Sequence, residues 1–274
     1  MKILALGDFH GKFPERLKKE AKKADFILAA GDYANADKIR KILFKHWTNK
    51  NWIDVVGNKK AKAMLKESFN SGLKILKELN SLGKKTFVIF GNTDFYKSVK
   101  DELFPKYYEK NIKNLKNLIL IDRKKSKLKD IEIIGHGGYV DVTDFIRHPL
   151  DEDKKKQKIR LERYKKDEKN LFKLFSGKKP KNFIFLTHYT PYGFFDKVKA
   201  KKSPMHNRHV GFEPYNKIIK KYQPLLCICG HMHEYQGIKR LGKTIVISTG
   251  PAYEGKAALI DIKGQKIKSI KFLK

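Results

Sequence analysis

The sequence predicts an α/β fold built around a largely parallel sheet. Short apolar runs, too short to be helices, alternate with longer segments in which leucine recurs at helical spacing. The first three apolar runs, within residues 3–11, 25–33 and 85–94, each end in a glycine followed by a polar residue. Such strand–helix–strand repeats are typical of parallel sheets, which bind ligands beyond the carboxyl ends of their strands. We therefore expect that edge of the sheet to carry the functional residues.

The composition is that of a globular chain with a very basic surface. The 274 residues include 62 Lys or Arg and 29 Asp or Glu, a formal net charge of +33, and 41% are hydrophobic. This charge is compatible with nucleic-acid binding and with the lysine-rich surfaces of hyperthermophile proteins. Because the lysines are spread over the whole chain and arginine is scarce, we favour the second interpretation.

No segment of the sequence resembles a membrane span or a signal peptide. Apolar runs stay below the ~18 residues that a transmembrane helix needs. The N-terminus passes directly from Met1 into a predicted strand, without the apolar region and cleavage site of a secretory signal. We therefore expect a cytoplasmic protein with no membrane partner.

In the N-terminal half, predicted strands and helices alternate. A strand over residues 3–6 precedes a basic helix over 14–23, which leads to a second strand over 25–30. A mostly helical segment over 38–82 then leads to a third strand over 85–90.

The C-terminal half adds a further series of strands. We expect them over residues 119–121, 131–135, 182–187, 224–230, 244–251, 257–262 and 267–272. A charged turn is predicted between the first two, and the last three are predicted to be successive antiparallel strands. The whole chain, 1–274, is predicted to form a single domain with helical or charged excursions near 35–82 and 141–181.

Polar side chains that can bind metals follow five of the predicted strands. They are Asp8 with His10, Asp32, Asn92, His188, and His231 with His233. Taken one by one, each is compatible with a turn residue or a hydrogen-bonded structural histidine. Together, seven oxygen and nitrogen donors are about what two divalent ions need, and imidazole suits Zn, Fe, Mn or Ni. Two ions about 3.5–4 Å apart form the clamp used for in-line phosphoryl displacement.

These motifs resemble those of the calcineurin-like metallophosphoesterase superfamily in type, order and strand context. The matching segments are Gly7-Asp8-Phe9-His10, Gly31-Asp32, Gly91-Asn92-Thr93-Asp94, Thr187-His188 and Gly230-His231-Met232-His233. The resemblance implies a four-layer α/β/β/α sandwich with mixed sheets. It also implies two divalent ions (Mn, Fe, Ni or Zn), with Asp32 bridging them. The ligands implied are Asp8, His10, Asp32 and His233 for one ion, and Asp32, Asn92, His188 and His231 for the other.

The implied activity is hydrolysis of a phosphate ester by a hydroxide held between the two ions, with Asn92 also acting on the substrate. Many members carry a histidine directly after the motif asparagine, where it helps to protonate the leaving group. This chain has Thr93 there, and a threonine hydroxyl is a poor general acid at neutral pH. We therefore expect a phosphodiesterase. The loop histidines His206 and His209 are candidates to bind the substrate phosphate, and His209 also to donate the proton.

Two alternatives remain open at this point. The charge of +33 is compatible with a nuclease acting on DNA or RNA. The loss of the usual histidine at Thr93 is compatible with a binding scaffold that has kept the fold but not the catalysis. Against the scaffold, a protein without chemistry has no need of seven polar groups at strand ends.

Overall fold

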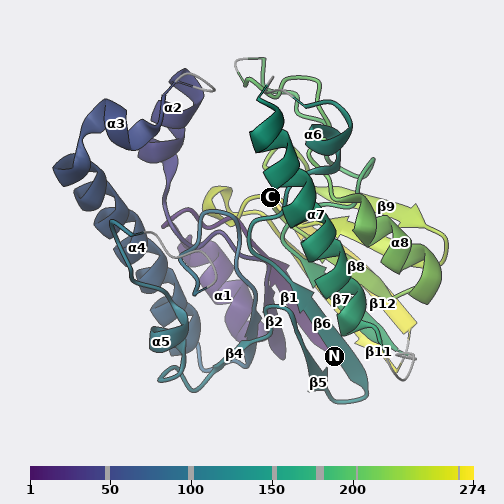
Figure 1. Cartoon of the computed structure of the whole chain (residues 1–274). Helices are drawn as coiled ribbons and strands as arrows, with labels where there is room; N and C mark the ends of the chain where they lie inside the picture. The colour runs from purple at the N-terminus through teal and green to yellow at the C-terminus, as the bar shows by residue number, and fades with distance from the viewer. Residues whose placement is uncertain (47–49, 98–101, 150–152, 177–181, 202, 265) are drawn as a thin grey trace.

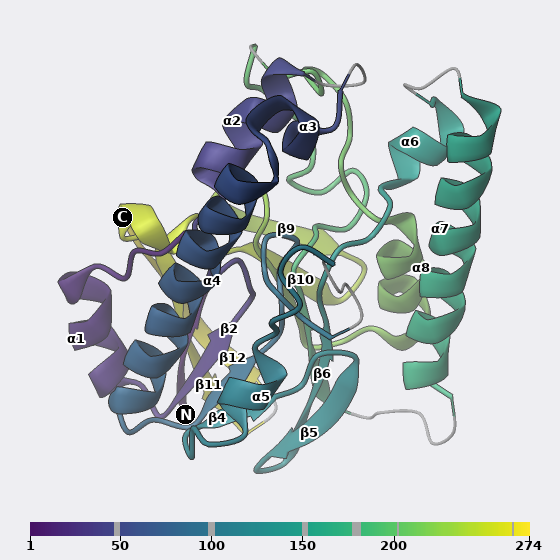
Figure 2. The same ribbon diagram turned by 60° about the vertical axis from the view of Figure 1, so that its left-hand side comes forward.

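Two six-stranded mixed sheets pack face to face, with helices on both outer sides (Figures 1 and 2). The computed structural model describes residues 1–46, 50–97, 102–149, 153–176, 182–201, 203–264 and 266–274. Three buried apolar clusters separate the layers: one between the sheets and one under the helices on each outer side. The α/β/β/α sandwich with mixed sheets is therefore confirmed.

The first sheet has the order β12-β11-β1-β2-β3-β4. Its strands are β1 (Lys2–Leu6), β2 (Phe26–Ala29), β3 (Thr86–Val88), β4 (Leu118–Leu120), β11 (Ala257–Lys263) and β12 (Lys266–Leu273). The four strands β1 to β4 are parallel, whereas β11 and β12 are antiparallel additions at one edge. The central strands are buried on both faces, as parallel strands between two layers must be.

The second sheet has the order β5-β6-β7-β8-β10-β9. Its strands are β5 (Lys124–Leu128), β6 (Ile131–His136), β7 (Phe183–Thr187), β8 (Leu226–Cys229), β9 (Gly237–Leu241) and β10 (Thr244–Ser248). Its four central strands are parallel, and β5 and β9 form antiparallel edges.

Three details of the predicted strands are wrong. The predicted charged turn before β6 contains the edge strand β5, and β9 was not predicted at all. Strand β10 pairs in parallel with β8, so the last three predicted strands do not form one antiparallel series. Both missed strands are mostly exposed and rich in basic residues, as edge strands often are, and so lack the apolar pattern of a buried strand.

The helices fall into two groups by position. Those on the outer sides of the sheets are α1 (Glu15–Lys23), α4 (Asn58–Ser81), α5 (Glu109–Ile112), α7 (Lys154–Leu174) and α8 (Glu213–Tyr222). Those at the end of the molecule opposite the N-terminus are α2 (Asp37–Lys45), α3 (Trp52–Val56) and α6 (Thr143–Arg147), as both views show. A short 3₁₀ helix spans Ala252–Glu254. Strand β1 runs toward this second group, so its carboxyl end lies at that end of the molecule (Figure 1).

The predicted excursions hold most of these helices. Helices α2 to α4 lie in 35–82, and α6 and α7 lie in 141–181, while residues 47–49, 150–152 and 177–181 fall outside the described part. Among the described residues, no helix is both long enough and apolar enough to cross a membrane.

Helix α4 packs closely against the loop that follows β2. At Gly72, a β-carbon would collide with the hydroxyl of Tyr108 and would lie 2.9 Å from the backbone nitrogen of Ala34. The Tyr108 ring is fully buried, and its hydroxyl donates to the carbonyl oxygen of Phe69 at 3.0 Å. Neither neighbour can move away freely, so a glycine is needed here.

We therefore expect Gly72→Ala to destabilise the protein by about 1–3 kcal/mol, the usual cost of overpacking. This is opposite in sign to the gain of about 1 kcal/mol that alanine brings over glycine in an open helix. Guanidinium unfolding measures the difference. Asn70→Ala, at an exposed position two residues earlier, is the control and should not destabilise. Equal stabilisation by both changes would show that the contact at Gly72 is loose.

Candidate metal centre

The loops after five strands meet between the two sheets. Asp8 follows β1, and its backbone N–H donates to the carbonyl oxygen of Gly31 after β2, at 2.9 Å. Both carboxylate oxygens of Asp8 lie 3.0 Å from the backbone nitrogen of His231, which follows β8 in the other sheet. The polar loops of the two sheets are thus tied directly to one another.

Four of the predicted ligands form one compact group: Asp8, His10, Asp32 and His233. One donor atom from each lies within 4.8 Å of all the others. The Nε2 atoms of His10 and His233 are 3.0 Å apart, and the Nε2 of His10 is 3.6 Å from Oδ2 of Asp32. All except His233 are buried.

The remaining predicted ligands form a second group around Asn92. Its Oδ1 atom lies 2.9 Å from Nε2 of His188 and 2.8 Å from Nδ1 of His231. Asp32 contacts this group too, because its Oδ1 is 3.5 Å from Nε2 of His188. The two oxygens of the Asp32 carboxylate therefore face different groups of donors.

The hydrogen bonds of His188 indicate that a cation fits here. Its Nδ1 lies 2.8 Å from the carbonyl oxygen of Ala30, which can only accept, so Nδ1 carries the proton. In the neutral ring, Nε2 then presents a lone pair toward the oxygens of Asn92 and Asp32. A divalent ion satisfies converging lone pairs of this kind, and a backbone carbonyl behind the ring is the usual support of a metal-binding histidine.

At Asp32, His10 and His231 the electrostatics favour the protonation states that bind metals, whereas at His233 burial is outweighed by the hydrogen bond and charge of Asp8, which raise its pKa. Burial would raise the pKa of Asp32, but the neighbouring His188 and His10 and the N–H of Thr93 hold it below its ordinary value. Burial lowers the pKa of His10, and burial lowers the pKa of His231 to about 3. A carboxylate that stays ionised and imidazoles that stay neutral are the forms that coordinate cations.

Four of the predicted ligands have left-handed backbone conformations. The φ angles are +57° at Asp8, +44° at His10, +55° at Asp32 and +68° at His231. Only nine described non-glycine residues have a positive φ, so these four are a large share. Backbone strain of this kind concentrates at functional sites, where the surrounding structure holds it in place.

The glycine before Asn92 is required by the same close packing. A β-carbon on Gly91 would collide with the carboxylate of Asp32. The glycine in this motif therefore lets two loops from neighbouring strands approach each other at the site.

One residue of the matched motifs had no predicted role and organises the site. Asp94 is buried, and its carboxylate accepts from the backbone N–H groups of Gly91, Asp32, Tyr33 and Ala34 at 2.7 to 3.1 Å. Burial and the charge of Asp32 raise the pKa of Asp94 to about 7, although its backbone hydrogen bonds act in the opposite direction. Asp94 fixes the turn that carries Asp32.

Thr93 and the two loop histidines lie in different settings. The Thr93 backbone donates to Oδ1 of Asp32 at 2.9 Å, while its hydroxyl donates to the carbonyl oxygen of Ala34 at 3.4 Å. His206 is exposed, and among the described residues no contact joins its side chain to a predicted ligand. His209 is partly exposed, and its Nδ1 lies 2.8 Å from Oδ1 of Asp196.

Asp196 is a residue that no pattern in the sequence singles out. It is 2% exposed, and its other oxygen accepts from the backbone N–H of Gly193 at 2.9 Å. Its pairing with Nδ1 leaves Nε2 of His209 directed away from Asp196. The His209 ring also lies 5.4 Å from the ring of Tyr192, four residues beyond His188. His209 is thus held beside the segment that carries a predicted ligand.

Two further side chains border the first group of donors. The ring of Tyr253 lies 5.7 Å from that of His10 and 5.5 Å from that of His233. Arg40, on α2, lies close enough for its positive charge to oppose protonation of both histidines. Neither residue belongs to a recognisable motif, so only the folded structure reveals them.

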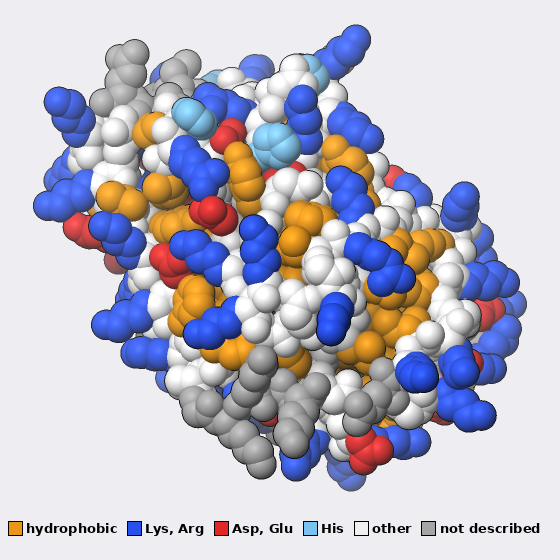
Figure 3. Space-filling model, turned by 90° about the vertical axis from the view of Figure 1, so that its right-hand side faces the viewer, with side chains coloured by type: hydrophobic (Ala, Val, Ile, Leu, Met, Phe, Trp, Pro, Cys, Tyr) orange, Lys and Arg blue, Asp and Glu red, His pale blue; other side chains and the backbone are white. Residues whose placement is uncertain are grey.

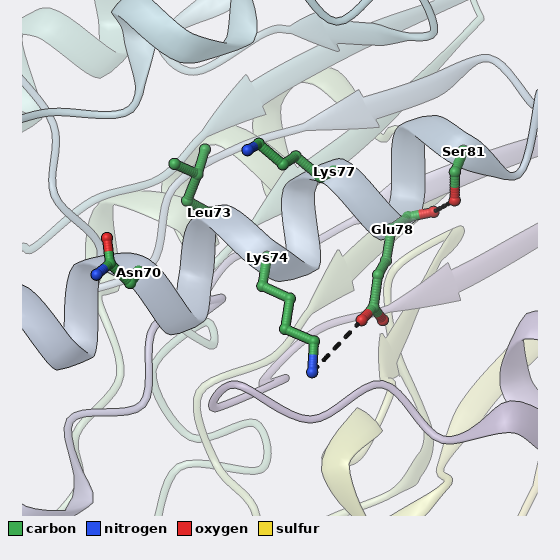
Figure 4. A pocket seen from close by; sticks show the side chains of 6 residues that line it. All are labelled: Asn70, Leu73, Lys74, Lys77, Glu78 and Ser81. Atoms are coloured by element: carbon green, nitrogen blue, oxygen red, sulfur yellow. Dashed lines mark hydrogen bonds and ion pairs between the residues drawn. The ribbon is translucent and has the colours of Figure 1, made fainter.

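A hollow along α4 is not part of this site. It is lined by Asn70, Leu73, Lys74, Lys77, Glu78 and Ser81, all from one helix (Figure 4). Within it, Nζ of Lys74 lies 3.9 Å from a carboxylate oxygen of Glu78, which also pairs with Lys18 of α1 at 3.0 Å. None of the predicted ligands lines it.

Two facing mixed sheets, with carboxylate, amide and imidazole donors gathered where their central strands end, define a class of metal-dependent α/β/β/α hydrolases. A sequence profile of the family described as "Metallophosphoesterase, calcineurin superfamily" matches residues 1–272. The chain belongs to this superfamily and is a metal-dependent phosphoric ester hydrolase.

Individual proteins similar to the chain span nearly its whole length. An uncharacterized protein of Methanocaldococcus jannaschii is 25% identical over 92% of this chain and 88% of its own. A solved structure from Thermus thermophilus has a TM-score of 0.51 at 17% identity, covering 98% of this chain and 97% of that one. A dimetal phosphatase from Danio rerio has a TM-score of 0.55 at 9% identity, covering 100% and 96%. The two structures share the fold.

The role of Asp94 predicts a large loss of stability on Asp94→Ala. The change leaves four buried backbone donors without an acceptor, and each such donor costs about 1–3 kcal/mol. Asp94→Asn keeps one carbonyl oxygen and should be less destabilising. Guanidinium unfolding of the wild type and the two variants measures the order of their stabilities. If Asp94→Ala unfolded at the wild-type denaturant concentration, the turn would not depend on this carboxylate.

Proposed function

We propose that the chain is a phosphodiesterase with a dinuclear metal centre in which Asp32 is the shared ligand. The proposed ligands are Asp8, His10, Asp32 and His233 for one ion, and Asp32, Asn92, His188 and His231 for the other. The observation that carries the proposal is the position of Asp32. Its Oδ2 lies 3.6 Å from His10 and its Oδ1 lies 3.5 Å from His188, so one carboxylate serves both groups. Mn, Fe, Ni and Zn all suit such oxygen and nitrogen donors.

When bound, the divalent ions would supply an activated water as nucleophile and neutralise charge on the phosphoryl group. The chain's own part is to position the groups around them. The amide oxygen of Asn92 faces His188 and His231, which leaves its NH₂ group to donate to a phosphoryl oxygen of the substrate. Arg40, whose guanidinium also pairs with Asp37 at 3.0 Å, adds positive charge on the side of His10 and His233, which favours an anionic substrate.

The leaving group decides which esters suit the site. Thr93 supports the turn through its backbone and directs its hydroxyl to the carbonyl of Ala34. We assign proton donation to His209 in its imidazolium form: Nδ1–H donates to Asp196, and Nε2–H passes its proton to the leaving oxygen, which leaves the ring neutral. Since His209 belongs to a different loop from Thr93 and pairs with Asp196, we propose that a diester with a second substituent reaching toward it suits the site best. His206, more exposed still, is proposed to contact only the outer part of the substrate.

Removing a shared or second-group ligand should abolish activity. With Mn²⁺ and bis(p-nitrophenyl) phosphate, we expect Asp32→Ala and His188→Ala to lose about 100-fold or more of the wild-type rate, since even the residues behind ligands are worth 10–100-fold. Elemental analysis should find about two ions per wild-type chain and fewer in both variants. Asp261→Ala, on β11, is the control and should keep both properties. Equal turnover by all four proteins would exclude the proposal, and one ion per wild-type chain would exclude its dinuclear part.

The loss of rate on replacing His209 should increase with the basicity of the leaving group. We expect His209→Gln to slow a diester with an alkyl leaving group by about 10²-fold or more, with little effect on a p-nitrophenyl ester, because only the alkoxide needs a proton. Asp196→Asn should act in the same direction but less strongly, and His206→Gln should raise KM alone. His148→Gln, at an exposed histidine, is the control. The same loss on both leaving groups would mean that His209 does not donate the proton.

The nuclease alternative is favoured by one observation, the net charge of +33. On the face shown in Figure 3, however, Lys and Arg side chains are scattered among other residues and form no continuous stripe. Binding of an oligonucleotide that weakens steeply with salt would support a nuclease. The scaffold alternative instead requires that the purified, metal-supplemented protein contain no bound metal.

A further inference from the structure

The helices that follow the Asp32 loop expose an unusual amount of apolar surface. We define the α2–α3 lobe as α2, α3 and the first turn of α4, comprising the described residues 37–46 and 50–62. Its large apolar side chains are Ile39, Ile42, Leu43, Phe44, Trp52, Ile53, Val55 and Val56. Of these only Ile39 is buried. Helices of a globular protein normally bury such a stripe against the core.

The exposure is concentrated in this lobe. Seven large apolar side chains of the described residues are at least 36% exposed, and three belong to the lobe: Leu43 at 38%, Phe44 at 41% and Val55 at 38%. In both ribbon views α2 and α3 stand at the outer end of the molecule, beyond the sheets (Figures 1 and 2). Single exposed apolar residues are ordinary, but a group of them on one projecting element indicates a binding surface.

The same lobe is strongly basic. It carries seven lysines and one arginine against two aspartates. The lysines are Lys38, Lys41, Lys45, Lys50, Lys59, Lys60 and Lys62, and all are exposed. On α2, the spacing of Lys38, Lys41 and Lys45 places them in a stripe between Ile42 and Phe44, with Leu43 on the opposite side of the helix. Within this stripe, Lys38 also pairs with Glu67 of α4 at 2.7 Å. Lysines of α2 therefore flank Ile42 and Phe44 directly, whereas Leu43 lies beside Arg40 and Ile39.

We propose that the α2–α3 lobe docks the protein on an anionic lipid surface. A helix that lies in the interface plane inserts its apolar side chains at the headgroup boundary and places lysines on the lipid phosphates. Both components are present on this lobe. The sequence-based expectation of no membrane partner rested on the lack of a long apolar run, which an interfacial helix does not need.

Charge and side-chain type argue against a second copy of the chain and against a nucleic acid as the partner of this lobe. A second copy docking through the same lobe would bring two surfaces with a large excess of lysine into contact. A nucleic acid would use the lysines and the exposed ring of Phe44, but it gains nothing from the exposed aliphatic groups of Leu43 and Val55. A lipid surface uses both the lysines and the aliphatic groups.

Docking through this lobe would place the lipid surface at the end of the molecule that carries the candidate metal centre. Helix α2 begins five residues after Asp32, at the end toward which β1 runs (Figure 1). The inference does not depend on the proposed function, because binding to lipid can be measured without substrate or metal.

The first test is co-sedimentation with vesicles of phosphatidylcholine alone, or with one-third phosphatidylglycerol. We expect the wild type to bind only the anionic vesicles, and to release them as salt is raised. The double variant Leu43→Glu/Val55→Glu should bind at least ten times more weakly. Ile238→Glu, on β9, introduces one acid at a site with 44% exposure and should bind as the wild type does. Circular dichroism confirms that each variant is folded.

A second pair of variants distinguishes binding through the α2–α3 lobe from binding caused by the basic surface as a whole. Lys41→Glu/Lys45→Glu reverses two charges in the lobe, and Lys125→Glu/Lys127→Glu reverses two exposed charges on β5. Only the first pair should lose binding to anionic vesicles. The proposal is overturned if the wild type does not bind vesicles, or if both pairs lose binding equally. It is also overturned if the Leu43/Val55 variant keeps vesicle binding but loses oligonucleotide binding or self-association.

Discussion

The structure depends on keeping one buried carboxylate, that of Asp32, ionised between two sheets. Its oxygens face His10 on one side and His188 on the other, and the N–H of Thr93 donates to it. A charge in this position is costly unless positive or hydrogen-bonding partners surround it. The two sheets each contribute partners, so the sandwich must be closed for the site to exist. The parallel centres of both sheets serve this need, because they bring the ends of β1, β2, β7 and β8 to the same place.

The central strands and the position of the motif residues in the loops after them could be predicted because each leaves a local signal in the sequence. A strand buried on both faces, such as β7, is an almost unbroken apolar run, and the motif residues follow it directly. Strands β5 and β9 leave no such signal, since edge strands in contact with water carry lysine instead. The assignment of strands to two sheets also needs long-range pairing: β1 pairs with β11, which lies more than 250 residues later.

The supporting residues of the site could not be predicted for a similar reason. Asp94 was visible in the motif, but its four backbone partners become neighbours only after the turns at Asp32 and Gly91 have formed. Asp196 stands in a loop with no periodicity, and its pairing with His209 spans 13 residues of irregular chain. Thr93 was visible as a departure from the family pattern. The structure adds that its backbone N–H donates to the Asp32 carboxylate, a contact that does not depend on which side chain occupies the position.

The left-handed bends at the ligands have a consequence for the handling of metals. Hydrogen bonds within the chain hold these bends in place. The carboxylate of Asp94 accepts from the backbone N–H of Asp32, and the carboxylate of Asp8 accepts from the backbone N–H of His231. In small zinc-dependent domains the ion itself holds the chain together, so chelation unfolds them. Here the bends have their own supports, so the fold does not depend on a metal ion to hold these loops. We therefore expect the folded protein to accept different divalent ions of similar size at the proposed centre.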